Sequence, residues 1–334
     1  MPTVSVIMVF HRDTAHFRPA VASVLSQTFR DLELILVDNG TALPAAALGD
    51  LGRDSRIRWV RLPRNEGIPA GHNAGVAAAS GEFIALADYD DVSLPHRVEA
   101  QVAALRGDAS LGLVSALAER VDATGRVIGR EFCLPDPADH RAYAPYATPI
   151  ITQVAMGRRE VLAAFPYRAE FPFAGDLDFQ ARVIERWRMA VLPEVLLRYR
   201  WYADQTTQQR GASIEGSRAA IQIFSGRRAA GRSENLTPTL ATIQADTPAE
   251  IWRRGAQLCL AEDFFAFAAF QARRSFAWDR SLAGAWRAAR LGWRAWRGAA
   301  PAERALVARM FFTGPVRALR LHPAERNIRA PAVA

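Results

Sequence analysis

Three carboxylates are concentrated in the four residues Asp88-Tyr89-Asp90-Asp91, directly after the apolar run of residues 83–87. Such a run has the length and character of a buried strand, and open α/β sheets bind ligands at the carboxyl ends of their strands. Carboxylates this close resist ionising together unless a cation lies among them, and a hard divalent cation prefers oxygen ligands. We therefore expect a divalent metal that holds a diphosphate here.

The elements around this cluster must support that expectation, because one Asp-x-Asp is expected about once by chance in a chain this long. Apolar runs of strand length alternate with helical patterns over the first 120 residues, which is typical of a mainly parallel sheet covered by helices. The expected strands are residues 4–10, 32–37, 57–62 and 83–87, and helices are expected over residues 17–25, 69–80 and 94–105. His11, Asp38 and the acidic cluster then follow three strand ends at one edge of the sheet.

The motifs along these elements resemble those of family 2 glycosyltransferases, in the order and spacing of that family. The matching segments are residues 4–8, 23–29, 34–40, 65–67, 73–75, 79–86 and 88–91. The resemblance covers residues 1–210 and implies an α/β GT-A (Rossmann-like) domain, with a mainly parallel sheet flanked by helices, that binds a nucleotide sugar. Residues 211–334 are rich in Ala, Arg and Trp and form an expected helical C-terminal region.

The resemblance also implies where the donor nucleotide binds. Asp38 would accept a hydrogen bond from the nucleobase, and Val9, Phe10, His11 and Arg12 would form a loop that lines the base and ribose. Asp38 has an alternative role as a turn-capping residue before Gly40. His11 is either the ring that stacks on the base or a surface histidine.

For the acidic cluster, the resemblance makes Asp90 the direct ligand of Mn²⁺ or Mg²⁺, while Asp88 reaches the ribose or a metal-bound water and is a second metal-site residue. Asp91 is expected to cap the following helix. The alternative for the whole cluster is a set of carboxylates that the dipole of the next helix favours. Such a metal would neutralise charge on the departing nucleoside diphosphate.

The segment of residues 173–179 resembles the part of the family that carries the catalytic base, with Asp176 at that position. A base there would take the proton of a hydroxyl acceptor that attacks opposite the diphosphate, which inverts the sugar carbon. Many relatives have Glu where this chain has Gly175. Asp176 is also expected to be the N-cap of the next helix, which is the structural alternative, and Asp178 a solvated carboxylate.

Residues 197–207 resemble the segment that closes over the diphosphate, and many relatives have His where this chain has Tyr202. A phenol is a poorer metal ligand than imidazole, so fewer protein ligands are expected. Arg198 or Arg200 would bind the pyrophosphate, and an ordinary edge-strand arginine is the alternative.

The C-terminal region carries the excess positive charge. Residues 281–334 hold ten of the 42 arginines and two of the 34 acidic residues, and this difference equals the net charge of +8. A helix over residues 282–297 would place Leu282, Trp286, Trp293 and Trp296 within an arc of about 80°. We expect residues 282–320 to contact an anionic membrane surface. The alternative is a core-packing helix whose arginines extend outward.

The remaining features limit the class of protein. The chain has 334 residues and two cysteines without zinc or redox spacing, which indicates core thiols in a reducing compartment. A cytoplasmic protein, peripheral on the inner face of the membrane, is expected, with no nucleic acid among its partners. The predicted function is transfer of a sugar, from UDP in preference to dTDP or GDP, to a glycan or lipid-linked hydroxyl acceptor in cell-envelope or surface polysaccharide synthesis. A non-catalytic glycan-binding module and a nucleotidyltransferase are the alternatives.

Overall fold

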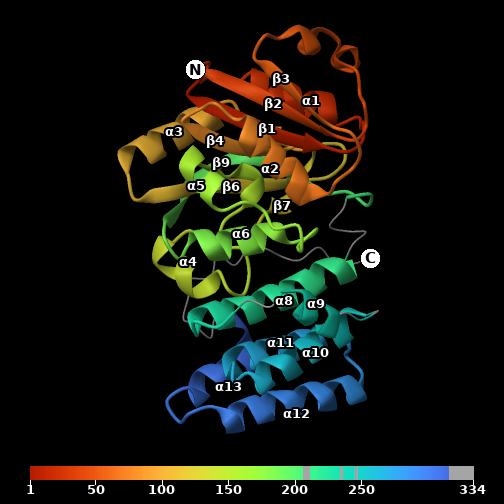
Figure 1. Cartoon of the computed structure of the whole chain (residues 1–334), viewed down its shortest axis with the longest axis vertical. Coiled ribbons are helices and arrows are strands. Elements are labelled where there is room, and N and C mark those ends of the chain that lie inside the picture. The colour runs from red at the N-terminus through yellow and green to blue at the C-terminus, as the bar shows by residue number, and fades with distance from the viewer. Residues whose placement is uncertain (206–210, 234–235, 244, 246, 316–334) are drawn as a thin grey trace. The chain divides into compact units, whose positions relative to one another are not determined.

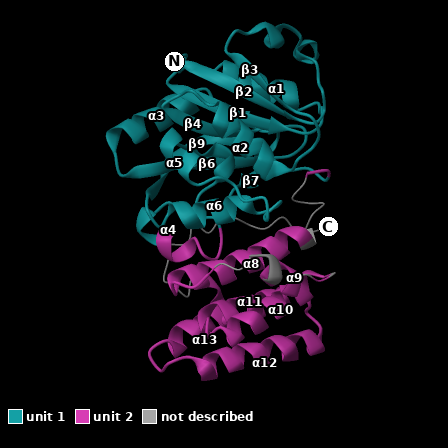
Figure 2. Cartoon of the chain, in the orientation of Figure 1, with its two compact units in different colours: residues 1–140, 148–203, 324–334 teal, residues 141–147, 204–323 magenta. Residues whose placement is uncertain are grey.

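The computed structural model describes residues 1–205, 211–233, 236–243, 245 and 247–315 of the chain (Figure 1). Contacts between Cα atoms divide it into two compact units, coloured separately in Figure 2. The first unit holds residues 1–140 and 148–203, and the second holds residues 141–147 together with the described residues from 204 onward. The domain boundary at residue 210 stays a prediction.

The first unit is built on one mixed sheet, whose main path runs β3-β2-β1-β4-β8-β6-β9-β5, with β7 paired to β6. Its parallel half consists of β1 (Val4–Phe10), β2 (Leu32–Asn39), β3 (Ile57–Leu62) and β4 (Phe83–Asp88). These are the four strands expected from the sequence. The other half, which the sequence did not indicate, contains β5 (Val92–Ser93), β6 (Leu111–Val121), β7 (Val127–Arg130), β8 (Met156–Arg158) and β9 (Arg188–Arg200).

The register of the parallel half places the expected polar groups at one edge. Phe10 of β1 pairs with Asp38 of β2, and Val9 pairs with Asp88 of β4. All three strands point the same way, so their carboxyl ends meet at this edge and His11 follows the central one. The predicted convergence of three strand ends is confirmed.

Helices cover both faces of this sheet (Figure 1). Side chains of β1 alternate between the faces, so Val6, Met8 and Phe10 join the cluster that includes α1, while Ile7 and Val9 face α2. The helical segments of the first unit are α1 (Phe17–Leu25), η1 (Ala45–Arg53), α2 (Ile68–Ala78), α3 (Arg97–Gly107), α4 (Pro137–Tyr143, shared with the second unit), η2 (Thr152–Val154), α5 (Arg159–Ala164) and α6 (Gly175–Val183).

The second unit is helical, as the sequence predicted for its C-terminal region. Its helices are α8 (Gly211–Ala229), α9 (Leu236–Ile243), α10 (Pro248–Ala261), α11 (Phe265–Trp278), α12 (Leu282–Gly298) and α13 (Arg304–Thr313). Trp252 and Cys259 are buried in its interior, and Cys133 is buried in the first unit, so both cysteines are core thiols as expected. Within the described residues, no helix combines the length and apolar character that crossing a bilayer requires.

Close packing of α2 on the sheet explains a motif glycine. A Cβ atom added at Gly75 would lie 2.4 Å from Cγ2 of Ile7, a buried residue in the central strand. We predict that Gly75→Ala lowers the free energy of unfolding by about 1–3 kcal/mol through overpacking, despite the better helix propensity of Ala. Gly107→Ala is the matched control, because no atom lies within 4 Å of its added Cβ. Urea unfolding measures both, and equal midpoints for the two variants would contradict the close approach.

Candidate active site

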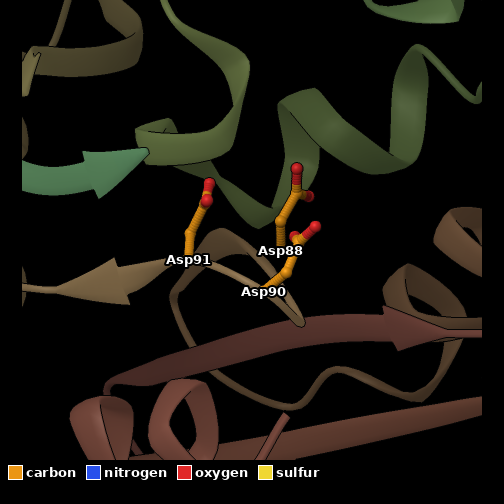
Figure 3. Close-up of side chains that lie close together, drawn as sticks. All are labelled: Asp88, Asp90 and Asp91. Carbon is orange, nitrogen blue, oxygen red and sulfur yellow. The ribbon is translucent and has the colours of Figure 1, made fainter. Parts of the chain in front are cut away.

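The acidic turn, residues 88–91, follows β4 directly and gathers the three carboxylates in one place (Figure 3). One carboxylate oxygen from each of Asp88, Asp90 and Asp91 lies within 4.8 Å of the other two. Asp90 and Asp91 are only 6% and 3% exposed. The chain therefore brings three charges into a space that water reaches poorly.

Burial and mutual repulsion make ionisation of this turn unfavourable. Burial, reinforced by the charges of Asp90 and Asp176, raises the pKa of Asp88 to about 7. Burial also raises the pKa of Asp90, and it raises that of Asp91 together with the charges of its two neighbours. One oxygen of Asp91, Oδ2, is buried without a hydrogen-bond partner.

These features fit a divalent cation. Oxygen atoms bonded to one Mg²⁺ or Mn²⁺ at about 2.1 Å lie within about 4.2 Å of each other, close to the spacing found here. A bound cation would favour the charged form of all three carboxylates and give the orphaned oxygen of Asp91 a partner. The donor set of Asp88, Asp90 and Asp91 is all oxygen, which suits a hard metal.

A buried arginine supports the acidic turn from the α3 side. Arg97 is 1% exposed, and its guanidinium donates to the carbonyl of Leu86 at 2.5 Å and to the hydroxyl of Ser93 at 2.9 Å. Burial lowers the pKa of Arg97 to about 10, and the charges of Asp91 and Asp88 act in the opposite direction. Sequence reasoning missed this residue because an isolated arginine is normally assigned to the surface. The available signal was its position among the buried residues Val98, Gln101 and Val102 of the same helix.

A tyrosine that follows β9 contacts the proposed metal ligand. The hydroxyl of Tyr202 donates to Oδ2 of Asp90 at 2.7 Å. Arg12 donates from Nη2 to the Tyr202 oxygen at 3.4 Å and from Nε to the Tyr89 oxygen at 3.0 Å. The His11 ring lies 5.7 Å from the Tyr89 ring. His11 and Arg12 therefore lie beside the acidic turn, as the sequence predicted.

Two other members of the expected base-lining loop belong to the sheet instead. Val9 and Phe10 are the last residues of β1, and the Phe10 ring is fully buried against Phe17, with ring centroids 4.6 Å apart. The expectation of a loop at these two positions is wrong, because β1 continues to Phe10 to pair with β2. Only His11 and Arg12 follow the strand.

Asp38 is buried and its carboxylate is already saturated. Oδ1 accepts from the backbone N–H and the hydroxyl of Thr41 at 2.8 and 2.7 Å, and Oδ2 accepts from the N–H of Leu43 and from Arg61 at 3.0 and 2.9 Å. This arrangement corresponds to the turn-capping alternative. The nucleobase contact stays a prediction, and it requires exchange of one of these bonds.

The start of α6 separates two aspartates with different environments. Asp176 lies in the first turn of the helix, and its charge is near enough to raise the pKa of Asp88. The N-cap is Ala174, in a left-handed backbone conformation, so the expected capping role of Asp176 is wrong. Residues two apart on a helix point about 200° apart, which lets Asp176 approach the acidic turn while Asp178 points elsewhere.

Asp178 is a buried ion-pair partner. Its side chain is fully buried and pairs with the guanidinium groups of Arg168 and Arg182, the latter at 2.8 Å. The expectation of a solvated carboxylate is therefore wrong, because the segment before α6 brings Arg168 over the helix. Asp178 fixes the start of α6 and, with it, the position of Asp176.

Arg200 holds the acidic turn through backbone groups. Its Nε donates to the carbonyl of Asp90 at 3.0 Å, and its Nη1 donates to the carbonyls of Asp122 and Ala123 at 3.1 and 3.0 Å. The backbone N–H of Arg200 donates to Oδ1 of Asp91 at 2.8 Å. These contacts favour a structural role over the expected pyrophosphate contact.

Asp91 does not cap α3, whose N-cap is His96, so that prediction is wrong. Arg198 lies about half-exposed near Glu119, as an ordinary strand arginine does. Thr206 and Thr207 lie outside the described residues.

Comparison with known proteins agrees with this arrangement. Residues 5–164 match the family described as Glycosyl transferase family 2. This chain contains a family 2 glycosyl transferase domain. The acidic turn lies within the matched part, whereas Asp176 and Tyr202 lie beyond it.

Among relatives, an uncharacterised glycosyltransferase of Haemophilus influenzae is 27% identical over 218 residues, which cover 62% of this chain and 68% of the relative. The putative glycosyltransferase EpsH of Bacillus subtilis is 27% identical over 184 residues, or 53% of this chain and 52% of EpsH. The succinoglycan biosynthesis protein ExoO of Rhizobium meliloti is 32% identical over 102 residues, covering 30% and 29%. These similarities identify this protein as a glycosyltransferase.

The fold is shared with a solved structure. Residues 1–349 of S. aureus TarS, in complex with UDP-GlcNAc, match 95% of this chain and 89% of that one at 14% identity and a TM-score of 0.56. This likeness supports the α/β glycosyltransferase fold with its C-terminal helices.

The raised pKa of Asp88 predicts how metal binding depends on pH. Below a pH of about 7 this carboxyl holds a proton that a bound metal would displace, so Mn²⁺ affinity should rise with pH through that value. Each displaced proton steepens the rise by about tenfold per pH unit. Isothermal titration calorimetry of the glycosyltransferase with MnCl₂ from about pH 5 to pH 8 measures this. A Mn²⁺ affinity that stays constant over this pH range would contradict a role of Asp88 as a metal ligand. The Asp88→Asn variant is expected to bind Mn²⁺ more weakly, and its affinity should change less steeply with pH.

Proposed function

We propose that this glycosyltransferase is inverting and depends on a divalent metal, Mn²⁺ or Mg²⁺. It would move a sugar from a nucleoside diphosphate sugar to a hydroxyl acceptor. The observation that carries the proposal is the approach of Asp176, at the start of α6, to the acidic turn at the end of β4. One carboxylate outside the expected metal-ligand set thereby acts electrostatically on the turn where a diphosphate would be held.

The chemistry requires a base and a stabilised leaving group. A cation held by Asp88, Asp90 and Asp91 would supply Lewis-acid stabilisation to the departing diphosphate. Asp176 would take the proton of the acceptor hydroxyl as its oxygen bonds to the anomeric carbon. The bond between that carbon and the diphosphate oxygen breaks on the opposite face, which inverts the configuration. The hydroxyl of Tyr202 would hold Asp90 in place through its hydrogen bond.

The similarities support UDP as the nucleotide and a polysaccharide as the product. TarS was crystallised with UDP and with UDP-GlcNAc, and ExoO is named for succinoglycan biosynthesis. We therefore propose a UDP-sugar donor and a glycan or lipid-linked acceptor of the cell envelope or cell surface, with transfer on the cytoplasmic side. His11 and Arg12 would contact the nucleotide beside the acidic turn.

Thermal shift tests the donor and the metal together. A ligand that binds only the folded state adds about 2.7 kcal/mol to the free energy of unfolding at a concentration of 100 times its Kd. The melting temperature rises as a result. We expect UDP to raise the melting temperature in the presence of Mn²⁺ and much less without it. The panel includes dTDP, GDP and CMP. A larger shift with another nucleotide would replace UDP, and no shift with any of them would contradict the donor site.

Asp176→Asn tests the base. We expect UDP release from the accepted UDP-sugar, measured with water or an acceptor, to fall by about 10²-fold or more because Asn cannot take a proton. The UDP and Mn²⁺ thermal shift should persist. Unchanged turnover in this variant would overturn the role of Asp176.

Asp178→Asn is the matched control on the same helix. Loss of this buried charge leaves Arg168 and Arg182 without their partner, and we expect the free energy of unfolding to fall by about 3 kcal/mol. Asp176→Asn should therefore lower turnover without a comparable loss of stability, whereas Asp178→Asn should lower stability, and turnover only as far as the start of α6 shifts. Turnover per folded molecule of the Asp178 variant shows whether its effect on activity arises only from unfolding.

A further inference from the structure

Helix α12 has the opposite arrangement to an ordinary surface helix. The residues it buries are small or of moderate size, and they pack toward its neighbours α10, α11 and α13: Gly284, Ala288, Leu291, Gly292 and Ala295. Close approach depends on this choice, because a Cβ added at Gly292 would lie 2.6 Å from the Phe311 ring. One face of α12 therefore packs closely against the other helices of its own unit.

The largest apolar side chains of α12 point away from that face. Leu282 is 87% exposed, and the exposures of Trp286, Trp293 and Trp296 are 79%, 55% and 40%. Phe312, on the adjoining α13, is 75% exposed. Side chains of this size are normally buried, so an outward row of them indicates a binding surface. The core-packing alternative for this helix is excluded by these exposures.

A band of arginines borders the apolar row. At 100° per residue, Arg287, Arg290, Arg294 and Arg297 occupy an arc of about 80° beside the row, and α12 contains no acidic residue. Arg287 pairs with Asp279, whereas Arg290 and Arg294 have no ion-pair partner within the described part of the chain. Two cations therefore remain available beside the tryptophans.

Arginines also lie against the tryptophan rings. The guanidinium carbon of Arg297 is 5.3 Å from the Trp293 ring centroid, and that of Arg304 is 4.9 Å from Trp296. Such pairs keep an aromatic ring and a positive charge at the same depth. Tryptophan and arginine both favour the boundary between lipid headgroups and acyl chains.

We propose that this surface, named the α12 face and formed by Leu282, Trp286, Arg290, Trp293, Arg294 and Trp296, binds the surface of an anionic lipid bilayer. Lipid phosphates and carboxylates would pair with the arginines, while the tryptophans enter the headgroup region. A second copy of the face is a poorer partner because it would bring arginine bands together without acidic residues from α12 to offset them. The described residues include part of the expected 282–320 segment, and residues 316–320 lie outside them.

The proposal concerns attachment and does not rest on the donor site. Full-length protein should co-sediment with vesicles of phosphatidylcholine containing about one-third phosphatidylglycerol and remain in solution with pure phosphatidylcholine. Binding should weaken as NaCl is raised, because the arginine contribution is screened. No binding to the anionic vesicles would overturn the proposal.

Two double variants separate the contribution of the tryptophans to vesicle binding from that of the arginines. Trp286→Ser with Trp293→Ser should weaken the vesicle partition coefficient by about tenfold or more, because two exposed rings no longer bury apolar surface. Arg290→Gln with Arg294→Gln should lower it by about tenfold or more on anionic vesicles. Both pairs are exposed, so folding and the UDP and Mn²⁺ thermal shift should be unchanged.

The matched control is Val127→Ser with Ile128→Ser, which removes two side chains that are each 48% exposed on β7 of the first unit. This variant should bind vesicles like the parent protein. Light scattering of the full chain without lipid tests the rival partner. A dimer that the tryptophan substitutions dissociate, without vesicle binding by the parent, would assign the face to a second copy and overturn the membrane proposal.

Discussion

The gathering of three carboxylates at the end of β4, with Asp90 and Asp91 buried and Asp88 partly buried, is the constraint on which the rest of the site depends. The parallel register places Asp88 beside Val9 at the end of β1, and the following turn adds Asp90 and Asp91 within 4.8 Å. Separate elements hold this turn: Arg97 lies on α3, Arg200 ends β9, and Tyr202 follows that strand. Burial and then mutual repulsion raise the pKa values of the turn, so its three carboxylates ionise together only with difficulty unless a cation offsets their charge.

The same residue type performs different tasks here because of position on an element. Asp176 and Asp178 are two residues apart on α6, yet one approaches the acidic turn and the other is enclosed by two arginines. The ion pair of Asp178 anchors the helix start from the interior. Asp176 accepts a hydrogen bond from the backbone N–H of Leu177 at 2.9 Å, so its position follows that of the helix start.

In the second unit, helix α12 packs on its neighbours through small residues, so its large apolar side chains lie at the surface. Glycine and alanine along the inner face of α12 let it lie close to its neighbours, so the tryptophans are not required for the interior. Burying small residues contributes less apolar area per residue, yet close backbone approach retains dispersion contacts. The α12 face is thus a product of where the small residues lie.

The sequence by itself determined the four parallel strands, the convergence of His11, Asp38 and Asp88 at one edge, and the family, because apolar period and strand-end polarity are local signals. Tertiary structure alone decided the rest. Asp38 is saturated by Thr41, Leu43 and Arg61, and Asp178 by Arg168 and Arg182, since the partners of a buried carboxylate come from segments that only folding brings near. Whether the tryptophans of α12 face inward was equally undecided, because an amphipathic period fixes which residues share a face but not which face the neighbouring helices cover.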